Sequence, residues 1–202
     1  MIMKIIGLCG GSGSGKGAVS SLFGNYGIPA IDTDAVYHDI TSHPSDCLDA
    51  LASEFGPSVV NGGRLDRATL REIVFNSPDS AEKLNRLNAI THKYIIDETE
   101  KIISAYEKNG FRGVIIDAPL LFESGLDKRC DTVIAVLANR EVRIARIMLR
   151  DGITLDAARA RIDAQLSDAE LVNRANIIIR NDGTIDELKS AVRLAYEQIF
   201  EK

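Results

Sequence analysis

The chain has 202 residues, of which 45% are apolar, so it is long enough to bury the hydrophobic core of one domain. Its 24 basic and 29 acidic side chains give a net charge of -5, without a long basic run of the kind that binds nucleic acid or an anionic membrane. The three cysteines, Cys9, Cys47 and Cys130, are widely spaced, which argues against a disulfide framework or a zinc site and favours a reducing compartment.

The first predicted element is a strand. The opening residues MIMKIIGLCGG contain an apolar stretch too short to span a membrane, and they lack the basic head and long apolar core of a secretory signal. Short apolar runs rich in branched residues recur along the chain and alternate with helical patterns; the runs lie at residues 4–9, 28–32, 113–117, 131–137 and 175–180. This alternation predicts an α/β fold in which helices flank a parallel sheet.

Helical patterns fill the long intervals between these strands. The interval after residue 32 contains no credible central strand and carries helical patterns at 65–75 and 80–110, the second closed by a glycine suited to a helix C-cap. Another helical stretch, at 139–173, is rich in arginine. We therefore expect one α/β core with two helical excursions, an arrangement suited to a substrate clamp and a lid.

A glycine-rich segment, GGSGSGKGAV at residues 10–19, follows the first predicted strand. Gly10, Gly15 and Lys16 match the pattern G-x-x-x-x-G-K and precede a helical pattern, which is the context that a phosphate-binding loop requires. The glycines permit a backbone whose N–H groups converge on phosphate oxygens, and Lys16 would reach the β and γ phosphates. A flexible turn is the alternative, but it would have no reason to end in Gly-Lys before a helix. Gly17 stands where such loops carry a hydroxyl that holds Mg²⁺.

Carboxylates follow the second and third predicted strands. Asp32, Thr33 and Asp34 come after the second strand, and the carboxyl ends of parallel strands share one edge of a sheet. This acidic pair suits the activation of a hydroxyl or the binding of metal-bound water, whereas Asp32 or Thr33 alone suits a helix N-cap. Asp117 ends an apolar predicted strand, which is the position of a carboxylate that binds Mg²⁺ through water in phosphate-transfer enzymes. A carboxylate that caps a turn would explain an aspartate at this position nearly as well.

A set of motifs resembles one enzyme family over nearly the whole chain. The segments GLCGGSGSGKG, IDTDAV, LDRATLREIVF, LNAITH, IIDAPLLFESGL, RIMLRDGIT, RIDAQ and ANIIIRNDG occur in the order and spacing of the dephospho-coenzyme A (dephospho-CoA) kinases. The resemblance implies the fold of nucleoside monophosphate kinases, a P-loop kinase domain with a five-stranded parallel sheet. It also implies transfer of the γ-phosphoryl group of ATP to the ribose 3′-hydroxyl of dephospho-CoA, the last step of coenzyme A synthesis.

The resemblance also implies roles for individual residues. The residues expected to wrap the ATP phosphates are Ser12, Gly13, Ser14, Gly15, Lys16 and Gly17. Asp34 would accept the proton of the ribose hydroxyl, beside Lys16 and Arg146 as catalytic groups. Arg146 and Arg150 lie four residues apart, hence on one helix face, and would fold over the phosphates. Solvated arginines paired with nearby acids are the alternative.

The family resemblance also implies which residues bind dephospho-CoA, the phosphoryl acceptor. Arg67, Arg71 and His92 match the helical region that binds dephospho-CoA, where the substrate's pyrophosphate needs cations. The family usually has a proline after this histidine, whereas Lys93 follows His92 in this chain. The chain therefore departs from the family pattern for the local turn. Gln165 matches a lid position for which we assign no catalytic role.

The expected organisation is a single P-loop kinase domain over residues 1–202. It has a core at 1–32, 111–138 and 174–202, a helical acceptor-binding insertion at 33–110 and a lid at 139–173. ATP is expected as co-substrate and Mg²⁺ as cofactor, with Asp117 on the metal side. We expect a cytoplasmic monomer that acts on ATP and dephospho-CoA and binds neither nucleic acid nor membrane.

Two alternatives to this activity remain at the level of sequence. Gly17 could mark a nucleotide-binding regulatory protein that no longer turns over, or the chain could be a kinase for another nucleotide or nucleoside. The presence of Lys16, Asp34, Asp117 and the arginines of the 139–173 segment favours the active enzyme, because a decayed kinase would be free to lose several of them.

Overall fold

The computed structural model describes residues 2–201, which divide into two compact units. The first unit joins the residues up to Ile31 with those from Tyr106 onward, and the second comprises Asp32–Ala105. Within residues 2–201, no helix combines the length and the apolar content that a membrane span requires.

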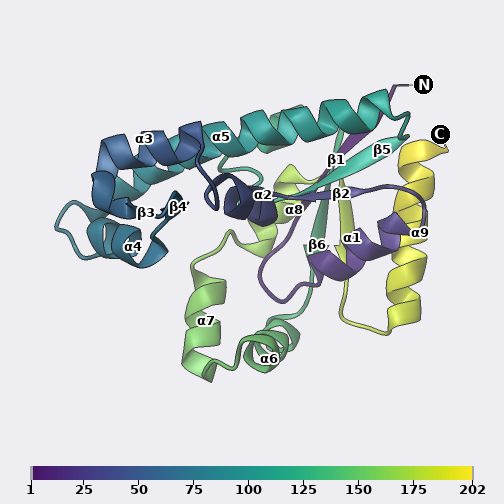
Figure 1. Cartoon of the computed structure of the whole chain (residues 1–202). Helices are drawn as coiled ribbons and strands as arrows, with labels where there is room; N and C mark the ends of the chain where they lie inside the picture. Colours follow the sequence, from purple (N-terminus) through teal and green to yellow (C-terminus); the bar gives the residue numbers. More distant parts are fainter. Residues whose placement is uncertain (1, 202) are drawn as a thin grey trace. The chain divides into compact units, whose positions relative to one another are not determined.

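A five-stranded sheet with the order β2-β5-β1-β6-β7 forms the centre of the first unit (Figure 1). Its strands are β1 (Lys4–Cys9), β2 (Ala30–Asp32), β5 (Gly113–Asp117), β6 (Thr132–Leu137) and β7 (Ile177–Arg180). β1 pairs in parallel with both β5 and β6, and β6 pairs in parallel with β7. The predicted five-stranded parallel sheet flanked by helices is therefore confirmed. The short 3-10 helix η2 (Leu126–Arg129) precedes β6.

The helices α1 (Lys16–Gly24) and α9 (Ile185–Phe200) lie beside one another against this sheet (Figure 1). In α1, Val19 and Phe23 are one helical turn apart and have no exposed surface. In α9, Leu188, Val192 and Ala195 repeat at helical spacing and join the same core as the apolar residues of the strands. This core stabilises the end of β1 and the start of α1, so it positions the glycine-rich loop between them.

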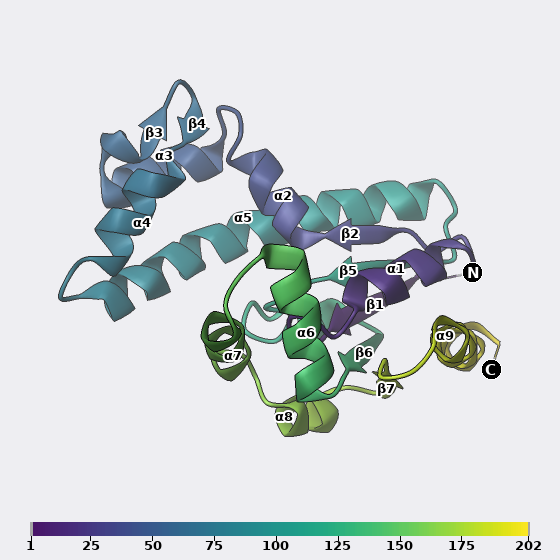
Figure 2. The same cartoon turned by 90° about the horizontal axis from the view of Figure 1, so that it is seen from below.

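The arginine-rich stretch forms three helices, which Figure 2 labels α6, α7 and α8. They are α6 (Arg140–Asp151), α7 (Leu155–Asp163) and α8 (Asp168–Arg174). Gly152, which has a φ of 64°, caps the C-terminus of α6, and Thr154 caps the N-terminus of α7, where its side chain accepts a hydrogen bond from a backbone N–H. Ile147 and Ile162 form a small core between α6 and α7, and Ser167 caps α8 with a capping box.

The second unit is mainly helical. Its elements are α2 (Thr33–Ile40), α3 (Asp46–Phe55), the 3-10 helix η1 (Pro57–Val59), the short hairpin β3 (Val60–Asn61) and β4 (Arg64–Leu65), α4 (Arg67–Phe75), and most of α5 (Ser80–Lys108). Leu51, Val59 and Val74 are fully buried in its core. α4 begins two residues later than the helical pattern at residue 65 because Leu65 pairs with Val60 and Asp66 caps the helix.

Candidate functional site

The glycine-rich loop, residues 10–15, links the end of β1 to the start of α1. Gly13 and Gly15 have φ angles of 78° and 96°, which lie in the left-handed region. A Cβ atom at Gly13 would lie 2.7 Å from the carbonyl oxygen of Arg143, and one at Gly15 would collide with the side-chain amide of Asn181. Both backbone conformation and available space therefore require glycine at these positions.

Three successive carbonyl groups of the loop are held by side chains from distant parts of the first unit. The hydrogen bonds are Arg143 Nε to Ser12 O at 2.9 Å, Arg146 Nη1 to Gly13 O at 3.2 Å, and Asn181 Nδ2 to Ser14 O at 2.8 Å. A trans peptide directs its N–H opposite to its carbonyl, so the N–H groups of Gly13 and Gly15 point away from these side chains. The loop thus has the form of a nest that can bind an anion.

The start of α1 adds positive character to the loop. Gly15 occupies the N-cap position, so no side chain caps the helix, and the first turn of α1 has no acidic residue within the described part of the chain. The exposed N–H groups and the helix dipole favour a bound anion here. The Nζ atom of Lys16 donates a hydrogen bond to Gly10 O at 3.2 Å, which holds the ammonium group back across the loop.

Gly17 is exposed in the first turn of α1. A Cβ atom added at this position would meet no described atom within 4 Å. The hydroxyl of Ser21, one turn further along, donates to the carbonyl oxygen of Gly17 at 2.8 Å and is used by the helix itself. The structure therefore leaves room for a serine at position 17, and Ser21 serves the helix rather than the loop.

Asp117 is the last residue of β5 and pairs in register with Leu8 of β1, close to the start of the glycine-rich loop. Burial raises the pKa of the neighbouring Cys9 thiol to about 12; the charge of Lys16 opposes this shift, and those of Glu123 and Asp117 add to it. Lys16 and Asp117 therefore both act on the end of β1. Within residues 2–201 no three His, Cys, Asp or Glu side chains gather into a metal site.

Arg146 and Arg150 do not have the same partners. Arg146 donates to Gly13 O and also to Asn181 O at 3.0 Å, so its planar fork joins the loop to the end of β7. Arg150 donates to both carboxylate oxygens of Asp151, at 2.7 and 2.9 Å. These hydrogen bonds, together with one that Arg161 donates to the same carboxylate, lower the pKa of Asp151 to about 2. A phosphate role for Arg150 stays a prediction.

The acidic pair after β2 has two distinct members. Asp32 caps α2: its Oδ1 atom accepts hydrogen bonds from the N–H groups of Asp34 at 2.9 Å and Ala35 at 3.2 Å. Asp34 lies in the first turn of this helix, where the helix dipole favours a carboxylate. The structure thus assigns the cap to Asp32, and the capping alternative does not account for Asp34.

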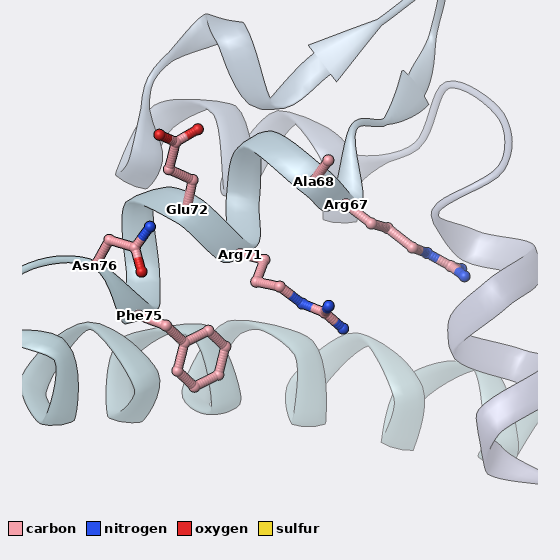
Figure 3. Close-up of a pocket in the computed structure, with 6 residues that line it drawn as sticks. All are labelled: Arg67, Ala68, Arg71, Glu72, Phe75 and Asn76. Atoms are coloured by element: carbon pink, nitrogen blue, oxygen red, sulfur yellow. The ribbon is translucent and has the colours of Figure 1, made fainter. Parts of the chain in front are cut away.

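A pocket of about 720 Å³ lies along α4 in the second unit. Arg67 and Arg71 line it, one helical turn apart, together with the exposed ring of Phe75 (Figure 3). Figure 3 shows both guanidinium groups extending to the same side of α4. The Arg67 guanidinium also lies 5.8 Å from the centre of the Tyr37 ring. The two arginines that the sequence predicts together therefore share one open, basic pocket.

His92 lies in α5, which continues without a break from Ser80 to Lys108. Lys93 is thus accommodated as a helical residue after His92, and no turn forms at this point. His92 does not line the α4 pocket and is partly buried. Its predicted role in acceptor binding stays a prediction.

Three residues of the loop's surroundings were not predicted from the sequence as functional: Arg143, Gln165 and Asn181. Arg143 is only 5% exposed, and burial lowers the pKa of its guanidinium group while Asp168 opposes that shift. Two local signals could have identified two of them. Arg143 precedes Arg146 by almost one helical turn, and Asn181 follows the end of β7 at the edge of the sheet that carries the loop.

Comparison with known proteins shows similarity along nearly the whole chain. The sequence profile of the dephospho-CoA kinase family matches residues 4–187. The dephospho-CoA kinase of Symbiobacterium thermophilum is 37% identical over 195 residues, which cover 96% of this chain and 80% of the relative. The crystal structure of a Thermus thermophilus protein has a TM-score of 0.81 and 31% identity, and the match covers 98% of this chain and 99% of that one.

A named kinase structure is also similar over its full length. The dephospho-CoA kinase of Campylobacter jejuni has a TM-score of 0.72 and 25% identity, covering 99% of this chain and 98% of that one. The family profile covers the glycine-rich loop, the acidic pair after β2, the α4 arginines and the three helices α6 to α8. The chain therefore belongs to the dephospho-CoA kinase family.

Proposed function

We propose that this chain transfers the γ-phosphoryl group of ATP to the ribose 3′-hydroxyl of dephospho-CoA, giving coenzyme A and ADP. The observation that carries the proposal is the phosphate loop, whose carbonyl groups are held by Arg143, Arg146 and Asn181 within a chain that matches the family profile from residue 4 to 187. A regulatory protein without turnover, or a kinase for another nucleotide, is not favoured, because the family match extends over the acceptor and lid segments as well.

On the donor side, the residues proposed to wrap the ATP phosphates are Ser12, Gly13, Ser14, Gly15, Lys16 and Gly17. Phosphoryl transfer proceeds through a loose transition state, so positioning and charge compensation supply most of the catalysis. Lys16 lies across the loop and would balance negative charge on the β and γ phosphates. Arg146 would present its planar fork to the transferred group after releasing Gly13 O and Asn181 O, and Arg150 would join it after leaving Asp151.

On the acceptor side, Asp34 would accept the proton of the ribose hydroxyl and orient its oxygen for attack. A carboxylate suits this step because its main task is to position the nucleophile. Arg67 and Arg71 would bind the pyrophosphate of dephospho-CoA in the α4 pocket, where two guanidinium groups can each form paired hydrogen bonds with phosphate oxygens. His92 is proposed as a further substrate-binding residue.

Asp117 is the residue that we propose for the Mg²⁺ side of the site. Its position at the end of β5, beside the start of the loop, suits a carboxylate that orients metal-bound water. When bound, Mg²⁺ would offset charge on the ATP phosphates. Gly17 contributes no oxygen ligand, but Mg²⁺ commonly keeps several waters, so the residues present fit the ion.

The organisation proposed for this reaction is a core at residues 1–32, 111–138 and 174–202, an acceptor-binding insertion at 33–110 and a lid at 139–173. We further propose that the enzyme is a cytoplasmic monomer. Size-exclusion chromatography with light scattering tests the oligomeric state, and a mass near twice that of the chain would contradict it.

A coupled assay of ADP release tests the proposed reaction directly. Dephospho-CoA, adenosine monophosphate and uridine are compared as acceptors at saturating ATP, and mass spectrometry identifies the product. We expect turnover with dephospho-CoA and formation of coenzyme A. No turnover with dephospho-CoA, or equal rates with uridine, would contradict the proposal.

A further inference from the structure

The side chain of Gln165 is bonded to the phosphate loop. Its Oε1 atom accepts a hydrogen bond from the backbone N–H of Ser12 at 2.9 Å, and its Nε2 atom donates to the Ser12 hydroxyl at 3.1 Å. Ser12 is the first of the residues proposed to wrap the ATP phosphates. Gln165 therefore engages both a backbone and a side-chain group of the loop, and any role for it in nucleotide binding rests on the proposed function of that loop.

Gln165 Oε1 is surrounded by hydrogen-bond donors of the kind that bind an oxygen of an anion. Besides the Ser12 N–H, it accepts a hydrogen bond from Arg143 Nη2 at 3.2 Å. A loop N–H together with a guanidinium group is the combination that binds a phosphate oxygen. A phosphate oxygen that approaches Ser12 therefore meets a neutral amide oxygen already bonded to the same donors.

The loop leaves space for this arrangement at Gly11. A Cβ atom on Gly11 would collide with the guanidinium group of Arg143 and would lie 3.1 Å from Gln165 Oε1. Gly11 is not among the glycines with positive φ, so its backbone conformation does not require glycine. The missing side chain instead makes room for Arg143 and Gln165.

The backbone around Gln165 is anchored on both sides. Its N–H donates to Ile162 O at the end of α7 at 3.2 Å, and the capping box of Ser167 and Glu170 starts α8 two residues later. The side chain is partly exposed, so rotation about its own bonds releases Ser12 without unfolding either helix.

We propose that the Gln165 side chain competes with a phosphate of the nucleotide for Ser12. Binding then requires the amide to leave the loop by rotation of the Gln165 side chain. The apparent Kd equals the intrinsic Kd divided by the fraction of molecules in which Ser12 is free. If Gln165 engages Ser12 in about nine-tenths of the molecules, its removal strengthens ATP binding about tenfold.

Isothermal titration with ATP and Mg²⁺ tests this competition in the full chain. Gln165→Ala and the nearly isosteric Gln165→Met are expected to lower the Kd for ATP about 5- to 10-fold. Gln165→Glu is expected to raise it about tenfold or more, because a carboxylate bonds Arg143 more strongly and repels phosphate. Gln198, exposed in α9, provides the matched control: Gln198→Ala should leave the Kd unchanged.

Thermal unfolding gives a second readout that a purely structural role would not produce. Gln165→Ala and Gln165→Met should lower Tm without nucleotide, because loop hydrogen bonds are lost, yet show a larger rise in Tm with ATP than the wild type. An unchanged or weaker affinity for ATP in both variants would overturn the inference and make Gln165 a structural or nucleotide-binding residue. If the wild-type chain itself failed to bind ATP, the proposed function would fail first.

Discussion

The phosphate loop and the α4 pocket both depend on arginines, but the arginines are held in different ways. At the loop, Arg143 is 5% exposed, and it and Arg146 each bond backbone carbonyl oxygens. In the α4 pocket, Arg67 and Arg71 lie on one helix face beside an open pocket, and Arg67 lies over an aromatic ring. The first set fixes backbone geometry, whereas the second leaves its positive charge facing an open pocket.

This difference predicts different kinetic consequences. Substitutions near the loop alter the geometry of the transferring group, which is important in the transition state and lowers kcat. Substitutions in an open basic pocket remove binding that is similar in the ground and transition states, so they raise the KM of the acceptor. Steady-state kinetics of single variants can therefore distinguish the two regions.

The largest effect is expected for Asp34→Asn. The amide cannot accept the proton of the acceptor hydroxyl, so kcat should fall by roughly 10²-fold or more, with ATP affinity close to normal. Steady-state kinetics with both substrates and titration with ATP measure the two quantities. Asp32→Asn is the matched control, because an asparagine oxygen can still cap α2, and its kcat should stay within about threefold of wild type. Nearly full kcat in Asp34→Asn would exclude it from the mechanism.

The next largest effect is expected for Arg146→Lys. Lysine keeps the charge but lacks the planar fork whose two nitrogens bond Gly13 O and Asn181 O, so kcat should fall about 10- to 50-fold, more than the KM for ATP rises. Arg159→Lys serves as the control, because Arg159 is exposed in α7 and pairs with Asp156 at 3.9 Å. A change confined to the KM for ATP would mean that Arg146 only binds the ground-state nucleotide.

A smaller effect, on the acceptor alone, is expected for Arg71→Ala. Loss of one guanidinium group from the α4 pocket should raise the KM for dephospho-CoA roughly tenfold and leave kcat and the KM for ATP within about twofold. The wild-type KM for dephospho-CoA should also rise with salt, since exposed charges are screened. Arg64→Ala, on the exposed strand β4, is the control. A fall in kcat without a change in the acceptor KM would contradict the proposed role of the pocket.

The smallest effect is expected for Gly17→Ser. The added hydroxyl has space, and one oxygen ligand in place of water is worth about 1 kcal/mol, so half-maximal activity should need about fivefold less Mg²⁺. Titration of Mg²⁺ at saturating ATP measures this shift. Gly24→Ser, at the other end of α1 and equally free of close neighbours, should show none. Superimposable curves for wild type and Gly17→Ser would mean that the missing hydroxyl costs nothing.

Most elements of the first unit could be predicted from local patterns. The five strands and the helices at 139–173 follow from hydrophobic periodicity, and the glycine-rich loop follows from Gly15-Lys16 between a strand and a helix. The elements of the second unit were harder to predict from the sequence. The β3–β4 hairpin is too short to produce an alternating pattern, and α3 was not predicted, although Ser45 caps it.

The sequence by itself determined the fold class, the family and the phosphate loop, because these depend on residues that are close along the chain and on the order of the motifs. Only the tertiary structure decided how the loop is held. Arg143 bonds Ser12 across 131 residues, and Asn181 bonds Ser14 across 167. The same holds for Gln165, whose bond to Ser12 spans 153 residues. Such contacts depend on how the strands and helices pack in three dimensions, and no local periodicity encodes them.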